Sequence, residues 1–144
     1  MTKDKNIPIY TISTAANLLN ISVHTIRMYE REGLLIPFKK PSGQRLYSDA
    51  DIERIECIRH SIKRGNLNIQ GIKKILSLIP CWSITNCSKK ERKLCNAYNS
   101  FIQPCWMYRY KENYHKTRSC RECRVYLETE TCESIKQKLK ELLQ

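Results

Sequence analysis

The chain has 144 residues with 26 lysines and arginines against 14 acidic residues, a formal charge of +12. The excess is not a basic tail, because each side of Ile79 carries 13 basic and 7 acidic residues. Such a balance favours a polyanionic partner, most simply nucleic acid. No apolar run approaches the ~18 residues of a membrane span, and the N-terminus lacks the apolar core of a signal peptide. We therefore expect a cytosolic protein with no membrane partner.

Two short helices are predicted near the N-terminus. The first runs from Thr11 to Leu19 with Ser13 as its cap, and the second runs from the N-cap Ser22 to about Glu32, where Gly33 ends it. In the second helix a spacing of three predicts a core-facing side made of Val23, Ile26 and Tyr29. The outward side is then made of His24, Thr25, Arg27, Met28 and Arg31.

A hairpin-like wing is predicted over residues 35–47, since two prolines, a Ser-Gly pair and Lys39-Lys40 are typical of a loop or hairpin rather than a helix. A capping box at residues 48–51 then opens a helix with an isoleucine stripe, which ends at Gly65. Asn68 is the predicted cap of a fourth helix, which ends before Pro80. Cys57, beside the stripe, is most simply a core residue without a function.

This order of elements is a winged helix-turn-helix, which places a recognition helix in the major groove while flanking groups hold phosphates. Long cationic and hydroxyl side chains stand at the helix and the wing, where such contacts are made. On this ground the candidate DNA-binding residues are His24, Arg27, Tyr29, Arg31, Lys39, Lys40 and Arg45; Ser22, Thr25 and Tyr47 join them through the family resemblance that follows.

Residues 7–79 closely resemble the DNA-binding half of the mercury-resistance-regulator (MerR) family. The matching residues are Ser22, Thr25-Ile26-Arg27, Tyr29-Glu30, Gly33-Leu34-Leu35, Pro37, Gly43, Arg45-Leu46-Tyr47 and Asp51-Ile52, and residues 68–76 resemble the heat-shock-repressor branch. The resemblance implies that Thr25, Arg27, Tyr29, Arg45 and Tyr47 lie at the DNA interface, chiefly on phosphates. For Tyr29, periodicity predicts a core ring while the family places its hydroxyl at the backbone of DNA.

The resemblance also implies a homodimer on an inverted-repeat operator, with RNA polymerase as a further partner on a bent promoter. Family members dimerise through a long helix after the fourth one. In this chain a cysteine-rich segment begins at Pro80 instead. The dimer contact is therefore expected from residues 80–144.

Seven of the eight cysteines lie between Cys81 and Cys132, within an approximate duplication. Each half reads Pro-Cys-Trp, then a cysteine, then Cys-x-x-Tyr. Reduced cytosolic thiols at this density favour metal binding over disulfides. The candidate ligands are Cys81, Cys87, Cys95, Cys105, Cys120 and Cys123, of which the last two form a C-x2-C pair. An iron-sulfur cluster and zinc both suit four thiolates. His60 and His115 are further candidate ligands, although a lone histidine is more often a surface residue, and Cys132 is a candidate for a spare ligand or an intermolecular thiol.

The cysteine segment resembles a small module of bacterial signalling and regulatory proteins, sometimes called a two-CW domain. The predicted fold is mainly α: a winged helix-turn-helix over 1–79, an irregular cysteine-rich metal-binding module over 80–132 and a short amphipathic helix over 133–144. The leading interpretation is a sequence-specific transcription regulator whose module senses metal or redox state. The alternative is an architectural or recombination-accessory DNA-binding protein with a purely structural zinc. A dithiol enzyme is not expected, because no βαβ pattern surrounds the C-x2-C pair.

Overall fold

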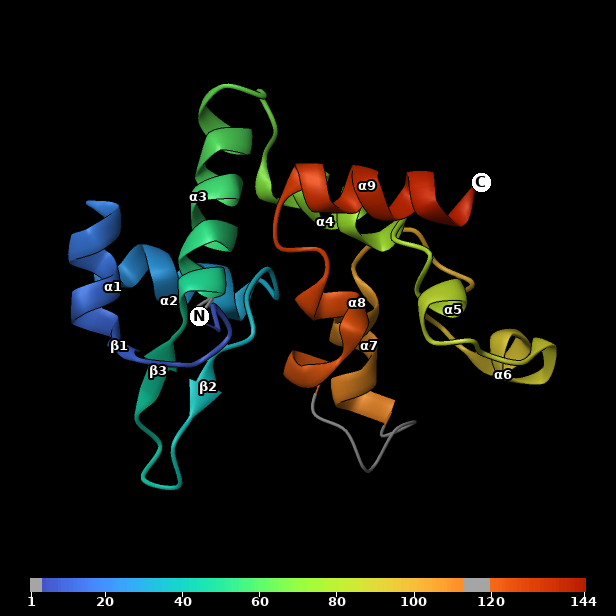
Figure 1. The fold of residues 1–144 in the computed structure, drawn as a ribbon, viewed down its shortest axis with the longest axis horizontal. Helices are drawn as coiled ribbons and strands as arrows, with labels where there is room; N and C mark the ends of the chain where they lie inside the picture. Colours follow the sequence, from blue (N-terminus) through green and yellow to red (C-terminus); the bar gives the residue numbers. More distant parts are fainter. Residues whose placement is uncertain (1–3, 113–119) are drawn as a thin grey trace.

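The computed structural model describes residues 4–112 and 120–144, and it confirms a mainly helical fold with a small wing (Figure 1). The N-terminal half contains β1 (Tyr10–Thr11), α1 (Ile12–Leu19), α2 (Val23–Arg31), β2 (Phe38–Lys39), β3 (Arg45–Tyr47), α3 (Asp49–Lys63) and α4 (Ile69–Ser77). The strands form one antiparallel sheet in the order β1-β3-β2. Helices α1 and α2 form the helix-turn-helix, and the β2–β3 hairpin is the wing.

The predicted wing is a short antiparallel hairpin with a glycine in its turn. Lys39 pairs with Arg45 across the hairpin, and the connecting turn contains Gly43 at a φ of 89°. A positive φ is easily reached only by glycine. The turn therefore presents residues 40–44 at the tip, where they are exposed.

Helix caps follow the sequence expectations, with one correction. Ser22, Ser48 and Asn68 each accept a hydrogen bond from the backbone N–H three residues ahead, and Ser48 forms a full capping box with Asp51. The predicted cap Ser13 is wrong, because it already lies inside α1. Thr11 is the cap, and its hydroxyl accepts from the Thr14 N–H at 3.2 Å. Thr11 takes this role because its backbone is still extended at the end of β1.

The cysteine-rich half is a chain of short helices rather than an irregular segment. It contains α5 (Cys81–Ile84), α6 (Lys89–Leu94), α7 (Cys105–Glu112), the 3-10 helix η1 (Cys120–Glu122), α8 (Arg124–Leu127) and α9 (Cys132–Leu142). Pro80 and Pro104 immediately precede α5 and α7. A backbone N–H at the start of a helix has no partner within the helix, so proline, which lacks this group, is tolerated there. A capping box between Ser88 and Glu91 begins α6. The final helix begins one residue earlier than predicted.

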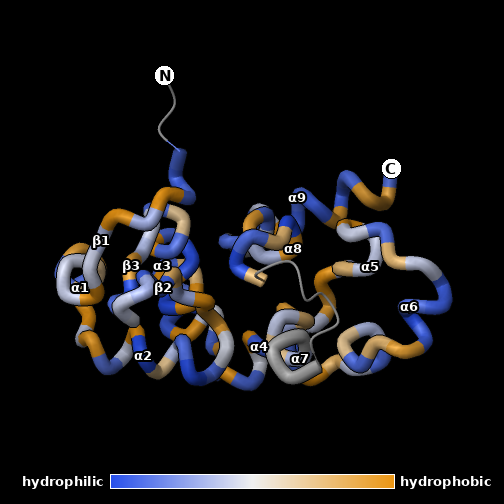
Figure 2. Tube along the Cα trace, turned by 90° about the horizontal axis from the view of Figure 1, so that it is seen from below, coloured by the Kyte–Doolittle hydropathy of each residue, from blue (hydrophilic) through white to orange (hydrophobic). Residues whose placement is uncertain are grey.

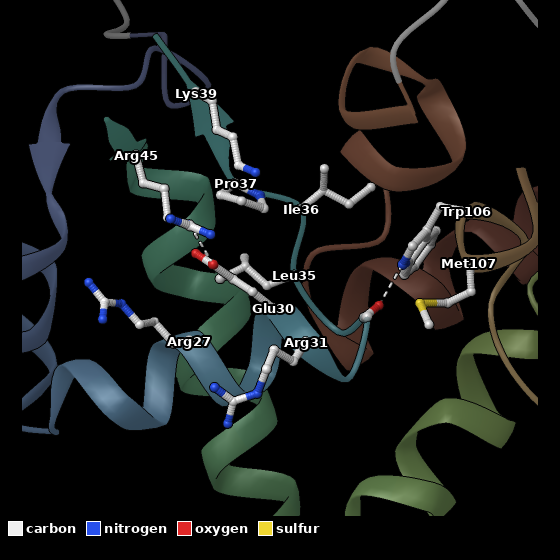
Figure 3. Close-up of a pocket in the computed structure, with 11 residues that line it drawn as sticks. Arg27, Glu30, Arg31, Leu35, Ile36, Pro37, Lys39, Arg45, Trp106 and Met107 are labelled. Atoms are coloured by element: carbon white, nitrogen blue, oxygen red, sulfur yellow. Dashed lines mark hydrogen bonds and ion pairs between the residues drawn. The ribbon is translucent and has the colours of Figure 1, made fainter. Parts of the chain in front are cut away.

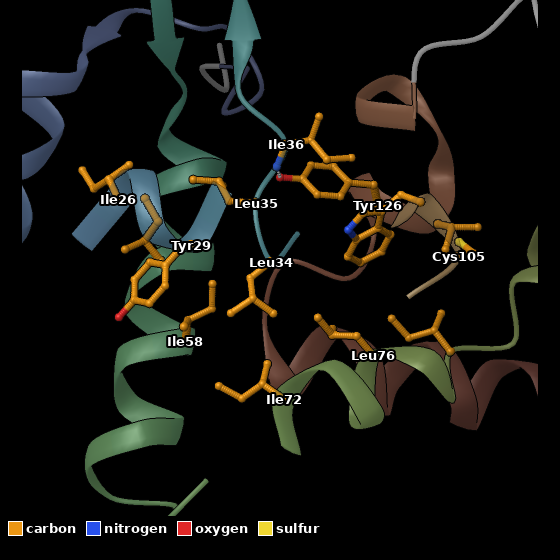
Figure 4. Close-up of a cluster of buried hydrophobic side chains, with 14 of the residues drawn as sticks. Ile26, Tyr29, Leu34, Leu35, Ile36, Ile58, Ile72, Leu76, Cys105 and Tyr126 are labelled. Carbon is orange, nitrogen blue, oxygen red and sulfur yellow. Dashed lines mark hydrogen bonds between the residues drawn. The ribbon is translucent and has the colours of Figure 1, made fainter. Parts of the chain in front are cut away.

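One hydrophobic core joins the two halves of the chain. Leu34 and Ile36 from the N-terminal half belong to the same buried cluster as Trp106, Val125 and Tyr126 from the C-terminal half (Figure 4). The proposed boundary at Ile79 thus separates two sequence patterns, but side chains from both sides of it pack in the same core. Within residues 4–112 and 120–144, no helix is long and apolar enough to cross a membrane.

Candidate nucleic-acid interface

The outer face of α2 carries cations that no described acidic group neutralises. His24, Arg27 and Arg31 are exposed, and Thr25 is half-buried. Neither arginine makes an ion pair within the described part of the chain. Both extend from the outer side of the helix (Figure 3). Ser22 is exposed, but its hydroxyl already accepts the Thr25 N–H at 3.2 Å as the helix cap.

Glu30 ties the recognition helix α2 to the wing. Its carboxylate lies 2.8 Å from the Arg45 Nε and also accepts a hydrogen bond from the Tyr47 hydroxyl. The Glu30 side chain is only 7% exposed while that of Arg45 is 36% exposed. The pair therefore fixes Arg45 at the seam between α2 and β3, with part of its side chain facing solvent.

The two predicted tyrosines lie in the core. Tyr47 is fully buried, and burial, then its hydrogen bond to Glu30, raises its pKa far above the usual range. Tyr29 is also buried, which raises the pKa of its hydroxyl; the charge of the nearby Arg59 acts in the opposite direction. A DNA contact from the Tyr47 hydroxyl would require breaking its bond to Glu30. Its role in this structure is to orient that carboxylate.

The exposed cations of the wing are Lys39 and Lys40. Between Lys39 and α2 lies a groove of about 740 Å³, whose polar rim is formed by Arg27, Glu30, Arg31, Lys39 and Arg45 (Figure 3). Its far end is closed by Trp106 and Met107 of α7. The cysteine-rich half thus reaches the edge of the basic surface, which the sequence interpretation missed.

Residues 33–37, which connect α2 to the wing, are held by the cysteine-rich half; we call them the strap. The Trp106 indole N–H donates to the Gly33 carbonyl at 2.6 Å, and the Ile36 N–H donates to the Tyr126 hydroxyl at 2.9 Å (Figures 3 and 4). Arg121 donates to the Ile36 carbonyl. Three side chains of the C-terminal half therefore satisfy backbone groups of the strap.

A side chain at Gly33 would be strained and would displace the Met107 side chain. Its φ is 77°, and a β-carbon there would lie 1.6 Å from the Met107 sulfur. Glycine at this position both ends α2 and allows α7 to approach. The first role was predicted from the sequence, and the second depends on a contact 74 positions away.

Buried charges complete the junction between the halves. Arg121 forms a forked pair with Asp51 at 2.6 and 3.1 Å, beside the capping box of α3. The Arg54 guanidinium lies 3.8 Å from the centre of the Tyr126 ring and donates to the Tyr126 carbonyl. Burial raises the pKa of the Tyr126 hydroxyl. Since a buried charge must be paired, these contacts favour one fixed arrangement of the two halves.

The six predicted metal ligands lie in the same part of the fold without forming a complete site. Cys81 and Cys105 are buried at the first residues of α5 and α7, whereas the half-buried set is Cys87, Cys95, Cys120 and Cys123. In the part of the chain that the structure describes, no three Cys, His, Asp or Glu side chains gather as metal ligands. His60 is exposed on α3. His115 and the Cys132 side chain lie outside what is described.

No disulfide links the seven cysteines whose side chains are described. Their thiolate chemistry suits soft metal ions, but the described arrangement does not supply the four ligands of a closed site. Iron-sulfur or zinc binding thus stays a prediction, and no part of the DNA-binding argument depends on it.

Comparison with known proteins agrees with this geometry. The family model described as MerR HTH family regulatory protein matches residues 10–79, the segment that forms the helix-turn-helix, wing and α4. The HTH-type transcriptional regulator YyaN of Bacillus subtilis is 38% identical over 96 residues, covering 66% of this chain and 69% of YyaN. The chain belongs to the MerR family.

Two further relatives extend the comparison. A Streptomyces coelicolor protein named as the heat shock protein HspR is 35% identical over 74 residues, which cover 51% of this chain and 49% of HspR. A probable heavy metal-dependent transcriptional regulator of Haemophilus influenzae is 41% identical over 68 residues, covering 46% of this chain and 52% of that protein. The chain thus spans about half the length of these two relatives. The family to which it belongs is one of regulatory proteins rather than enzymes.

Proposed function

We propose that this MerR-family chain is a sequence-specific transcription regulator that grips duplex DNA with α2 and the wing. The observation that carries the proposal is the row of exposed cations at Arg27, Arg31, Lys39 and Lys40, none of which pairs with a described carboxylate. Unpaired cations on adjoining elements are suited to neutralise phosphates on both sides of a groove. His24 and Arg31 are the proposed base-edge or groove contacts.

Glu30 gives the wing a defined position for this task. Because it anchors both Arg45 and Tyr47, the wing and the recognition helix present their cations as one rigid surface. Arg45 then contacts a phosphate with the part of its guanidinium that Glu30 leaves exposed. A preorganised surface loses less conformational freedom on binding than two mobile elements.

The strap is the proposed route by which the cysteine-rich half affects DNA binding. It joins α2 to the wing, and Trp106, Tyr126 and Arg121 hold its backbone. A change that moves α7 or α8 would move the strap. The spacing between the recognition helix and the wing would then change as well. Regulation would then act on DNA geometry without an effector touching DNA.

Binding to duplex DNA tests the proposal if a charge reversal on α2 is compared with the same charge reversal elsewhere on the chain. Arg27→Glu and the control Lys90→Glu on α6, an exposed lysine far from the basic surface, change the net charge equally. We expect Arg27→Glu to abolish specific binding in fluorescence anisotropy, while Lys90→Glu causes only the weak loss due to long-range attraction. Equal losses in both variants would contradict a specific interface on α2.

We further propose a homodimer on an inverted-repeat operator. The support is the apolar face at the end of α9, where Leu139, Leu142 and Leu143 are 36%, 41% and 84% exposed. A two-fold protein matches a two-fold operator. Sedimentation of the full chain should show a dimer that Leu142→Glu converts to a monomer; a monomeric wild type would exclude this assembly.

A metal response is the second candidate function. The similar Haemophilus influenzae protein is named as heavy metal-dependent, and six cysteines here lie within 43 residues. Anaerobic purification with metal analysis and an absorption spectrum tests it. Absorbance near 400 nm would indicate an iron-sulfur cluster, a colourless metalloprotein would indicate zinc, and a metal-free protein would exclude both.

A further inference from the structure

The two halves of the sequence duplication form the same aromatic contact in three dimensions. We call residues 80–98 unit 1 and residues 104–126 unit 2. In unit 1, Trp82 meets Tyr98 edge to face with ring centres 5.1 Å apart at 88°. In unit 2, Trp106 meets Tyr126 at 5.2 Å and 88°. Each unit therefore builds the same aromatic pair from its Pro-Cys-Trp and Cys-x-x-Tyr motifs.

In unit 2 this pair holds a peptide segment. The strap is not helical, and two of its backbone groups are bound by the indole N–H of Trp106 and the hydroxyl of Tyr126. Trp106 and Tyr126 retain exposures of only 2% and 3%. The strap side chains Leu34, Leu35 and Ile36 are buried as well. The pair thus recognises backbone, and the apolar side chains of the segment pack around it.

In unit 1 the equivalent pair is uncovered. Tyr98 is 39% exposed and Trp82 is half-buried. Neither the Trp82 indole N–H nor the Tyr98 hydroxyl makes a hydrogen bond with any residue that the structure describes. The same donor and acceptor that bind the strap in unit 2 are therefore unused here.

Apolar side chains lie exposed next to the pair of unit 1 in the sequence. Leu94, Phe101 and Ile102 are 61%, 69% and 57% exposed. Helices α5 and α6 lie at the opposite end of the molecule from α1 in both views (Figures 1 and 2). A partner bound there would leave the basic surface of α2 and the wing accessible.

The charge around unit 1 indicates the chemistry of that partner. Helix α6 carries four cations, Lys89, Lys90, Arg92 and Lys93. Its one carboxylate, Glu91, accepts the Ser88 N–H at 2.7 Å in the capping box. An occupant with acidic residues beside its apolar segment would complement this helix.

We propose that Trp82 and Tyr98 form a second peptide-docking site, which takes a non-helical apolar segment of another protein flanked by acidic residues. The Trp82 indole N–H donates to a carbonyl of the segment, and the Tyr98 hydroxyl accepts one of its N–H groups. A second copy of this chain is not the favoured occupant, because its own strap is buried under its own unit 2. The proposal is independent of DNA binding.

The test uses the full chain and a fluorescein-labelled peptide, Glu-Glu-Gly-Leu-Leu-Ile-Pro-Glu-Glu, which copies the strap between acidic residues. Fluorescence anisotropy should show saturable binding. Trp82→Phe and Tyr98→Phe each remove one hydrogen bond and keep a ring, so each should weaken binding about five-fold. Tyr10→Phe, a matched loss of a hydroxyl in β1 that bonds Asp49, should leave peptide affinity unchanged.

Four results would overturn the proposal, three of them in the binding assay. The first is the absence of saturable binding to the wild type, and the second is equal affinity in wild type, Trp82→Phe and Tyr98→Phe. The third is equal binding of a peptide made only of glutamates, which would reduce the contact to charge. Sedimentation provides a separate readout: a wild-type dimer that Trp82→Phe dissolves would identify a second copy as the occupant and so exclude the foreign peptide.

Discussion

Tyr126→Phe removes one oxygen atom from the contact between the cysteine-rich half and the strap. The ring keeps its edge contact with Trp106 at 5.2 Å and its stacking under Arg54 at 3.8 Å. The bonds from Trp106 and Arg121 to the strap also remain. What is lost is the acceptor for the buried Ile36 N–H, and a buried donor left without a partner costs about 1–3 kcal/mol. Urea denaturation should show that decrease in the free energy of unfolding.

The duplication supplies the matched control. Tyr98→Phe makes the same chemical change at the equivalent position of unit 1, where the hydroxyl bonds no described residue and the side chain is 39% exposed. Its unfolding free energy should change by less than about 0.5 kcal/mol. Affinity for duplex DNA should fall in Tyr126→Phe and not in Tyr98→Phe, because only the former loosens the strap. Equal stability and equal DNA affinity in the two variants would refute the clamping of the strap.

Further predictions concern the wing, alkaline pH and the cysteines. Lys39→Ala should lower the slope of log affinity against log salt by about one unit. Arg45→Ala should lower the affinity for DNA more than Lys39→Ala does, because it also leaves the Glu30 carboxylate without its cation. Equal losses of affinity in anisotropy titrations would contradict the ion pair between Arg45 and Glu30. Because burial raises the pKa of Tyr47, the folded chain keeps this proton above the ordinary value of about 10. The protonated Tyr47 hydroxyl thus stabilises the fold fully below about pH 10 and less as the pH rises further. Above about pH 10 the free energy of unfolding should fall with pH more steeply in the wild type than in Tyr47→Phe, by up to about 1.4 kcal/mol per pH unit. Equal slopes in the two proteins would contradict this effect of Tyr47. Cys120→Ser should reduce bound metal after anaerobic purification while Cys57→Ser should not, and full metal content in Cys120→Ser would remove it from the ligands.

Much of the DNA-binding half could be predicted because its signals are local. Ser22, Ser48 and Asn68 begin helices by bonding a backbone group three residues away, so a short stretch of sequence contains the whole interaction. The spacing of Ile26 and Tyr29 correctly predicted that both are buried. The cap of α1 was misplaced because Thr11 and Ser13 are both good caps, and the strand β1 decides between them.

The junction between the halves could not be predicted in the same way. Trp106 and Gly33 are 73 positions apart, and nothing near either residue indicates the other. The short helices α5 and α8 have four residues each, which is too few for a helical period to be visible. The repeat itself was a usable signal, since it pairs each tryptophan with the tyrosine of the same unit. The two aromatic contacts were nevertheless not predicted, and the repeat alone does not indicate which of them is covered.

The central claim is that α2 and the wing read duplex DNA. Selection from a random duplex pool with the full-length protein, followed by sequencing, tests it most directly. The wild type should enrich one defined motif with two-fold symmetry, and a variant combining Arg27→Ala with Arg31→Ala should enrich none. If the wild type enriches no motif, or the variant enriches the same one, then this surface does not read DNA.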